Sequence, residues 1–256
     1  HVGVEVRHYK TTSPTTNLWS AHINLCVAHV HMEATKPPTA LASTGSWAAK
    51  TGALLAVNGD FYKTGPVRIY GQAVGLGTPW PEKQNGTWSG YAWEWFYNHH
   101  GWIGFQHDNV WFSHSEHSKK NAAKLGLSQG WSPTKVVQTL PAGLLGLVSG
   151  FPELVVEGKQ VTCSSPTAAS CFPDRGDFKA RHPRTAMGLS QDKKTFILMV
   201  VDGRTSKSKG MYGTELAEVM KKLGAWEAFN LDGGGSSQMW LAGKGYLNDY
   251  KGNNNG

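Results

Sequence analysis

The chain has 256 residues, of which 39% are hydrophobic and 17% charged, and it contains 31 glycines. This length suffices for one large domain, and the composition excludes a disordered or coiled-coil chain. No apolar run approaches the roughly 18 residues that a transmembrane helix needs, so no membrane span is expected. We therefore expect a globular, loop-rich fold that contains strands.

Basic residues outnumber acidic ones, 25 against 18, which gives a formal net charge of +7. Such a surplus favours acidic partners, for example phosphorylated glycans or cell-wall polymers. The basic residues are scattered and gather only in short doublets, so no stripe for nucleic acid is visible. We therefore expect a glycan or sugar-phosphate partner and no nucleic acid, while the oligomeric state stays open.

The cysteines and the first residue both point to an oxidising compartment. The chain begins at His1 without a signal-like segment, so we expect a secreted protein whose signal peptide has been removed. Cys163 and Cys171 lie in a loop rich in Ser, Pro and Ala and are expected to form a disulfide, with two reduced cysteines as the alternative. Cys26 lies in an alternating apolar run and is expected to be a buried thiol.

Alternating strands and one short helix are expected in the N-terminal part. The predicted elements are strands over residues 2–9, 22–33 and 53–57 and a helix within residues 39–52, capped by Ser43 or Thr44. Asn58, Gly59 and Asp60 follow the last of these strands directly. Polar residues just beyond the carboxyl end of a buried strand often form a site, although a plain Asn-Gly turn is the alternative.

Residues 79–133 differ in character from the rest, because they hold seven of the eleven tryptophans and several histidines. Tryptophan rings stack on sugars, so this segment is either a lip over a glycan site or an insertion held together by aromatic packing. His114 and His117 are spaced like half of a metal site. The serines and lysines around them favour an exposed turn instead.

The most regular part of the chain begins at residue 184. Residues 184–189 and 196–201 predict strands joined by a hairpin turn, the second strand being buried on both faces. A helix starting near Thr214 and a strand over residues 226–231 follow, which is the length of a right-handed crossover between parallel strands. Asp202 and Asp232 are then expected at one rim of the sheet. Whether their strands are neighbours stays open.

The turn over residues 230–237 packs one aspartate, three glycines and two serines close together. Such glycines favour positive φ values or a ligand close to bare backbone, and a tight turn without a ligand is the alternative. No helix is predicted to follow, so the turn is neither a P-loop nor a dinucleotide fingerprint. We expect consecutive backbone N–H groups and the two serine hydroxyls to hold phosphate, with charge from Arg184 and Arg204.

These stretches resemble the motifs of the phosphodiester glycosidase family. The matching segments are residues 57–62, 184–188, 201–203 and 230–237, in that order and with similar spacing. The resemblance implies a mixed α/β fold with a mixed sheet in one domain over residues 1–256. Relatives usually continue with a further strand, so we expect that strand to be missing or cleaved off and residues 252–256 to form an exposed loop.

The resemblance and the residue pattern together define a set of predicted site residues. Asp60 departs from the family, in which many members have a small residue at this place. The predicted catalytic residues are Asp232, Asp202, Asn58 and Arg184. The predicted substrate-binding residues are Asp60, Thr185, Arg204, Gly233, Gly234, Gly235, Ser236 and Ser237.

The leading hypothesis is a secreted hydrolase that cleaves a glycosyl-phosphate diester in a glycan or cell-envelope polymer. One carboxylate acts as nucleophile or base at the anomeric carbon while the phosphate departs, and no cofactor is required. A first alternative is a metal-dependent phosphodiesterase or nuclease in which Asp60, Asp202 and Asp232 hold a divalent cation. A second is a non-catalytic glycan-binding module that uses tryptophans such as Trp93 and Trp95.

Overall fold

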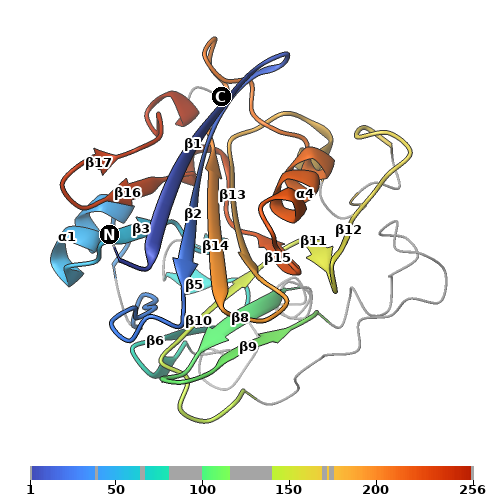
Figure 1. Cartoon of the computed structure of the whole chain (residues 1–256). Helices are drawn as coiled ribbons and strands as arrows, with labels where there is room; N and C mark the ends of the chain where they lie inside the picture. Colours follow the sequence, from blue (N-terminus) through green and yellow to red (C-terminus); the bar gives the residue numbers. More distant parts are fainter. Residues whose placement is uncertain are drawn as a thin grey trace.

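The computed structural model describes residues 2–37, 40–63, 67–80, 100–115, 140–168, 172 and 176–254. A seven-stranded sheet, the main sheet, forms the centre of the molecule in the order β1-β2-β14-β13-β15-β11-β12 (Figure 1). Its strands are β1 (Val4–Thr12), β2 (Thr15–Asn24), β11 (Glu153–Val156), β12 (Lys159–Gln160), β13 (Arg184–Leu189), β14 (Thr195–Val201) and β15 (Glu227–Asn230).

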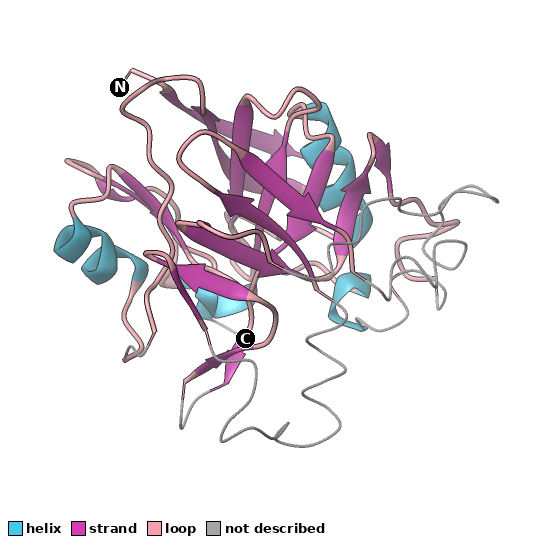
Figure 2. Ribbon diagram, turned by 90° about the horizontal axis from the view of Figure 1, so that it is seen from below, coloured by secondary structure: helices cyan, strands magenta, loops and turns pink. Residues whose placement is uncertain are grey.

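In the part of the chain that the structure describes, three smaller sheets and two helices surround the main sheet (Figure 2). The second sheet has the order β7-β6-β10-β8-β9 and consists of β6 (Ala73–Gly75), β7 (Thr78–Pro79), β8 (Gly101–Phe105), β9 (Val110–Ser113) and β10 (Gly146–Gly150). The other elements are β3 (Leu55–Val57), β16 (Met239–Leu241), β17 (Gly245–Tyr246), β4 (Tyr62–Lys63), β5 (Arg68–Ile69), the helices α1 (Thr44–Thr51) and α4 (Gly213–Lys222), and the 3-10 turns η2 (Gly176–Lys179), η3 (Gly234–Ser236) and η4 (Gly252–Asn254). In the described part of the chain, neither helix is long and apolar enough to cross a membrane.

Two apolar layers fill the space on either side of the main sheet. Ile197 and Met199 of β14 pack with the α4 side chains on one face. Leu198 and Val200 pack toward the second sheet on the other face. The prediction that this strand is buried on both faces is therefore confirmed, because alternate side chains of one strand enter two separate cores.

The predicted crossover near the C-terminus is present. Strand β14, helix α4 and strand β15 follow one another, and both strands are antiparallel to β13, so they run in the same direction. They are not neighbours, because β13 lies between them. The expected combination of helices and strands in one unit is confirmed, but the expected mixed sheet is corrected, since every ladder in the described part of the chain is antiparallel.

The second predicted strand is displaced. It spans Thr15–Asn24 instead of residues 22–33, because the hairpin with β1 already closes at the Thr12–Thr15 pair. Asn24 Oδ1 accepts a hydrogen bond from the Cys26 backbone N at 2.9 Å and turns the chain out of the sheet. Cys26 is exposed, which corrects the prediction of a buried thiol. The predicted disulfide stays a prediction, because Cys171 lies outside the described residues.

The helix within residues 39–52 is confirmed as α1. The Ser43 side chain caps it by accepting a hydrogen bond from the Ser46 backbone N, as the cap pattern predicts. Gly52 ends the helix with a φ of 74°, a left-handed conformation that glycine adopts without strain. The next strand, β3, carries the chain to Asn58.

Part of the tryptophan-rich segment belongs to the second sheet. Trp102 of β8 is 2% exposed and packs with Leu147, and Trp111 of β9 lies against the same cluster, so these two rings serve packing. Residues 81–99 and 116–139, with Trp93, Trp95 and His117, lie outside the described residues. His114 is 2% exposed, which corrects the expectation of an exposed turn.

Candidate active site

Three of the four motifs, residues 57–62, 184–188 and 230–237, meet at the side chain of Asn58, directly after β3. Asn58 Nδ2 donates to the backbone oxygen of Asp232 at 2.8 Å. Asn58 Oδ1 accepts hydrogen bonds from Thr185 Oγ1 at 2.7 Å and from the Gln238 backbone N at 3.1 Å. The Asn58 amide thereby connects β3 to β13 and to the turn over residues 230–237, here called the glycine turn. This geometry makes Asn58 a positioning residue for Asp232.

Asp232 lies at the wall of a cavity of about 630 Å³ that Asn58, Asp60 and Ser236 also line. Its backbone N donates to the Gly59 oxygen at 3.1 Å, so the segments that carry Asp60 and Asp232 are bonded to each other. Its Oδ1 accepts from the Gly233 backbone N at 2.8 Å. The carboxylate is half-buried and has a fixed orientation toward the turn.

The glycine turn is folded on itself. The backbone N atoms of Ser236 and Ser237 donate to Gly233 and Gly234 oxygens at 3.1 Å, which forms the turn η3, and Gly234 N donates to Pro183 O at 3.0 Å. These amides already donate inside the protein, so the predicted row of N–H groups for phosphate is not assembled. Ser236 lines the cavity, and the buried Ser237 Oγ has no hydrogen-bond partner among the described residues.

The Gly234 backbone and the Arg204 side chain lie next to each other. Gly234 has a φ of 59°, and a Cβ at this position would lie 3.2 Å from Arg204 Nη2. Arg204 itself has a φ of 60°, an uncommon conformation for a residue with a side chain. Its Nη1 donates to the Asn253 oxygen at 3.1 Å. The structure therefore places the positive charge of Arg204 against the turn, where the sequence predicts it.

Asp202 follows β14 and is 3% exposed. Its Oδ1 accepts hydrogen bonds from Asn248 Nδ2 at 3.0 Å and from the Asp249 backbone N at 2.9 Å. Burial raises the pKa of the Asp202 carboxyl, and these hydrogen bonds oppose that rise. The carboxylate holds the C-terminal segment in place, a role that the sequence analysis did not foresee.

The C-terminal segment up to Asn253 is part of the site region, which corrects the prediction of an exposed loop at Asn253. Asn253 in η4 is 0% exposed. Its Nδ2 donates to Ser237 O at 3.2 Å and to Asp202 Oδ1 at 3.4 Å, and its Oδ1 accepts from the Gly203 backbone N at 3.0 Å. The amide of asparagine offers donors and an acceptor at once, so the Asn253 side chain is buried with both of its polar atoms hydrogen-bonded.

Arg184 faces away from Asn58. It begins β13 and its neighbour Thr185 points to the opposite side of the strand. Its Nη1 donates to Asp177 Oδ2 at 2.9 Å and its Nε to Met211 O at 3.1 Å, and its guanidinium carbon lies 4.3 Å from the centre of the Phe178 ring. These contacts anchor η2 on the α4 side of the main sheet. The geometry therefore gives Arg184 a structural position and no place at the glycine turn.

Asp60 has partners that the sequence analysis missed. Its Oδ2 lies 2.6 Å from His100 Nδ1 and accepts a hydrogen bond from Ser149 Oγ at 2.5 Å, and its Oδ1 accepts from the Phe61 backbone N at 2.8 Å. The His100 Nε2 atom is buried and has no hydrogen-bond partner among the described residues. Because His100 and Ser149 are 40 and 89 positions away, no local motif signals this network.

His182 is a second residue near the turn that the sequence analysis did not single out. Its backbone packs against Gly203 and Gly210, and its half-buried ring has an Nδ1 without a partner among the described residues. Burial lowers the pKa of His182, and the positive charges of Arg184 and Arg204 lower it further. A neutral ring is therefore favoured at neutral pH.

The three aspartates of the metal hypothesis bind different segments. Asp60 holds His100 and Ser149, while Asp202 holds the C-terminal segment. Within the described ranges, no group of three or more His, Cys, Asp or Glu side chains is arranged to hold a metal ion. The cation stays a proposal that a chelation experiment tests.

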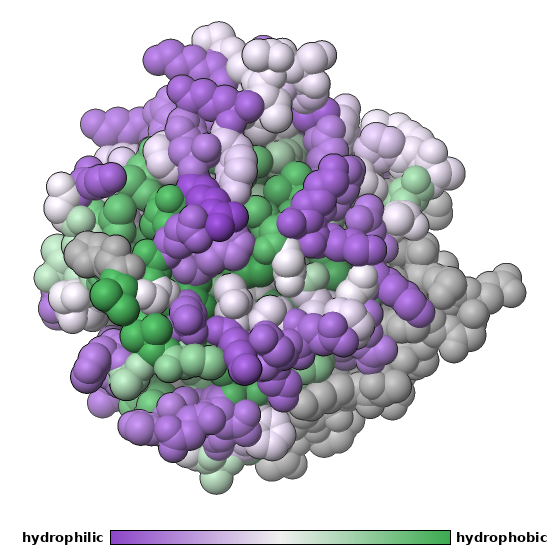
Figure 3. Space-filling model, viewed as in Figure 1, coloured by the Kyte–Doolittle hydropathy of each residue, from purple (hydrophilic) through white to green (hydrophobic). Residues whose placement is uncertain are grey.

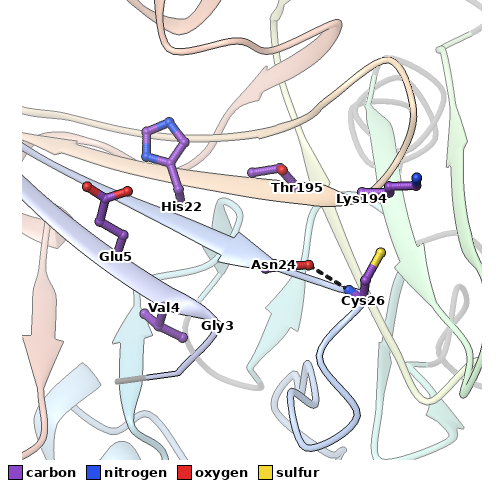
Figure 4. A pocket seen from close by; sticks show the side chains of 8 residues that line it. All are labelled: Gly3, Val4, Glu5, His22, Asn24, Cys26, Lys194 and Thr195. Carbon is purple, nitrogen blue, oxygen red and sulfur yellow. Dashed lines mark hydrogen bonds between the residues drawn. The ribbon is translucent and has the colours of Figure 1, made fainter.

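A second, shallow hollow of about 550 Å³ lies at the end of β1, β2 and β14, around His22 and Lys194 (Figure 4). Cys26 lies at its edge, next to the Asn24 side chain that accepts its backbone hydrogen bond. None of the predicted site residues lines this hollow. The candidate active site is therefore the cavity beside Asp232.

The fold and the motifs that meet at Asn58 are those of a glycosidase, a class of hydrolases. A family model for phosphodiester glycosidase matches residues 51–255. The chain belongs to the phosphodiester glycosidase family. The match includes Asn58, Thr185, Asp202 and the glycine turn.

Individual relatives are more distant. The SPbeta prophage-derived uncharacterized protein YomE of Bacillus subtilis (strain 168) is 40% identical over 73 residues, which is 28% of this chain and 11% of that protein. The chain therefore spans about a tenth of the length of this relative.

Solved structures share the fold. The catalytic domain of zebrafish N-acetylglucosamine-1-phosphodiester alpha-N-acetylglucosaminidase, auto-inhibited by its pro-peptide, has a TM-score of 0.57 at 17% identity, with 96% of this chain and 74% of that chain covered. A hypothetical protein from Synechocystis has a TM-score of 0.62 at 15% identity, with 96% and 59% covered. A candidate exported protein of Burkholderia pseudomallei K96243 has a TM-score of 0.56 at 18% identity, with 91% and 70% covered. At these identities the likeness concerns the fold alone.

Proposed function

We propose that the protein is a secreted hydrolase that cleaves a glycosyl-phosphate diester in a glycan or cell-envelope polymer. Membership of the phosphodiester glycosidase family supports the class of reaction. The observation that carries the proposal is the Asn58 amide, which bonds Thr185 and the Asp232 backbone and so fixes one carboxylate at a cavity wall. The description of the Burkholderia pseudomallei neighbour as a candidate exported protein supports secretion.

In the proposed reaction, Asp232 acts at the anomeric carbon, as nucleophile or as the base that takes a proton from water. The bond between the anomeric carbon and the ester oxygen breaks, and its electron pair leaves with the phosphate monoester. Water supplies the oxygen of the new sugar hydroxyl. A phosphate is a good leaving group, so it needs positive charge and hydrogen-bond donors more than a strong general acid.

The neighbouring residues take separate roles in this proposal. Ser236, on the cavity wall, donates its hydroxyl to a phosphate or sugar oxygen, and Arg204 against the turn supplies positive charge. Asn58 and Thr185 position Asp232. Asp202 orders the C-terminal segment against the turn. Arg184 has no role at the phosphate.

Hydrolysis of the methyl diester of α-N-acetylglucosamine 1-phosphate in ¹⁸O-labelled water tests the proposal. The sugar is the one that the name of the zebrafish enzyme specifies. We expect the label in the released sugar, and a drop of about 100-fold or more in kcat/KM for Asp232→Asn. Asp108→Asn, whose side chain is 91% exposed, is the control and keeps full activity. Equal rates for wild type and Asp232→Asn overturn the assignment.

The same experiment separates the alternatives. Label in the phosphate, together with loss of activity in chelator, indicates a metal-dependent phosphodiesterase that breaks the P–O bond. Binding of a glycan without turnover, unchanged in Asp232→Asn, indicates a non-catalytic module. The tryptophans that such a module was expected to use, Trp93 and Trp95, lie outside the described residues.

A further inference from the structure

We propose that the alcohol on the phosphate is apolar, so that the substrate is a sugar 1-phosphate diester of an alkyl or isoprenoid-type alcohol. This inference rests on the proposed function and adds the class of aglycone to it. It is argued from the lining of the cavity beside Asp232, in which apolar residues predominate.

Apolar residues predominate around the cavity, although His29, Glu33 and Thr35 line it as well. Asn58, Asp232 and Ser236 line it where the phosphodiester is proposed to react. Leu198 of β14, Leu55 of β3 and Val148 of β10 are among the apolar residues that line it. The volume of about 630 Å³ falls in the range of sites that enclose a small molecule.

An apolar chain fits these walls better than a second sugar or a glycerol unit. Each hydroxyl group that is moved from water against aliphatic side chains loses hydrogen bonds that the walls do not replace. Each methylene group that is moved there gains affinity, by about three- to fourfold. A glycosyl phosphodiester placed with its phosphate at Asp232 therefore directs its alcohol into surroundings that select for hydrocarbon.

Exposed apolar residues also gather at this cavity. Five large hydrophobic residues are exposed in the described part of the chain, and three of them, Val2, Leu41 and Tyr62, line the cavity. Figure 3 shows apolar surface between hydrophilic side chains on one face of the molecule. Single exposed hydrophobic residues are ordinary, but several at one opening indicate a contact surface for an apolar ligand.

A chain-length series tests the inference. The probes are methyl, butyl and decyl diesters of α-N-acetylglucosamine 1-phosphate, used below their micelle concentrations. We expect kcat/KM to rise by about 50-fold or more from the methyl to the decyl diester, mainly through KM, because buried methylenes add affinity. Equal or falling kcat/KM along the series overturns the inference and leaves the proposed function intact.

Two matched leucines give the variant test. Leu41 is 51% exposed and lines the cavity, whereas Leu76 is 53% exposed and does not. We expect Leu41→Ser to lower the decyl-to-methyl ratio of kcat/KM at least threefold and Leu76→Ser to leave it unchanged. The same ratio in both variants overturns the inference, because similar exposure makes their effects on stability comparable.

If none of the diesters is hydrolysed, the proposed function has failed. A binding measurement then still tests the inference. Decyl phosphate and methyl phosphate are titrated calorimetrically into the Asp232→Asn protein. Tighter binding of decyl phosphate, weakened by Leu41→Ser and not by Leu76→Ser, supports the apolar site. Equal binding of the two phosphates overturns it.

Discussion

Glu227→Gln is expected to stabilise the protein above neutral pH and to flatten its pH dependence. Glu227 of β15, Glu153 of β11 and His114 after β9 form a cluster in the interior, with side chains 0–1% exposed. The two ring nitrogens of His114 lie 3.4 Å from Glu153 Oε2 and 3.5 Å from Glu227 Oε2. The Ser115 backbone N also donates to Glu153, and the Glu157 backbone N donates to Glu227.

The direction of the effect follows from the two pKa shifts. Burial raises the pKa of Glu227 to about 8, and the repulsion by Glu153 and Glu157 adds to burial while His114 opposes it. Burial alone lowers the pKa of His114, but the charges of Glu153 and Glu227 outweigh it and raise that pKa. The folded cluster therefore retains protons that the unfolded chain releases. The resulting stability is present below pH 4.5 and is lost as the pH rises through about 8.

The magnitude follows from the size of the shift in Glu227. A change in pKa from 4.5 to about 8 corresponds to at most about 5 kcal/mol, at 1.36 kcal/mol per unit. Between pH 5.5 and 7.5, one retained proton lowers the free energy of unfolding of the wild type by about 3 kcal/mol. Glutamine has the same shape and still accepts from the Glu157 backbone N, so the variant loses this slope without a cavity.

Urea unfolding at pH 5.5, 6.5 and 7.5 measures the effect. We expect the free energy of unfolding of Glu227→Gln to vary less across this range and to exceed that of the wild type at pH 7.5. The control is Glu218→Gln on the exposed side of α4, where the side chain is 48% exposed, and it follows the wild type. Parallel pH curves for wild type and Glu227→Gln would refute the reasoning.

Two further variants test the positions of Asn253 and Arg184. Asn253→Ala removes the hydrogen bonds to Asp202 and Ser237 and leaves the buried Gly203 backbone N–H unpaired. The free energy of unfolding in urea is therefore expected to fall by about 2–3 kcal/mol. No loss relative to the exposed control Lys251→Ala would show that Asn253 does not anchor the C-terminal segment. Arg184→Met removes a buried guanidinium that holds η2 and is expected to lower stability by about 3 kcal/mol. The kcat/KM of the folded Arg184→Met protein for the methyl diester stays within about threefold, and a 100-fold loss there would place Arg184 at the phosphate after all.

Local patterns predicted several elements well. The run over residues 184–189 matches β13, the Ser43 cap begins α1, and strand, helix and strand follow one another from β14 to β15. These features depend on side-chain periodicity and on capping groups a few residues apart, which a sequence displays directly. The same patterns placed Asp202 and Asp232 beyond the ends of two strands that run in one direction.

Such local patterns did not predict contacts between residues that are far apart in the sequence. The face that Arg184 takes was not predictable, because β13 is buried on both sides and its alternation favours neither. The Asp60–His100 pair, and the Asn253 amide beneath Asp202, join positions 40 and 51 residues apart. In the sequence, Glu227 resembles an ordinary polar residue near the end of a strand. In the structure it is buried with His114 and Glu153.

The sequence by itself determined the strands, the helices and the polar residues that follow them, because those depend on neighbours along the chain. Only the tertiary structure decided which of these polar groups bind distant segments and which line a cavity. The side chains of Asp202 and Arg184 bind distant segments, Asn58 binds distant segments and also lines the cavity, and Asp232 and Ser236 line the same cavity. That difference depends on the packing of segments far apart in sequence, where hydrogen-bond partners are set by position in space.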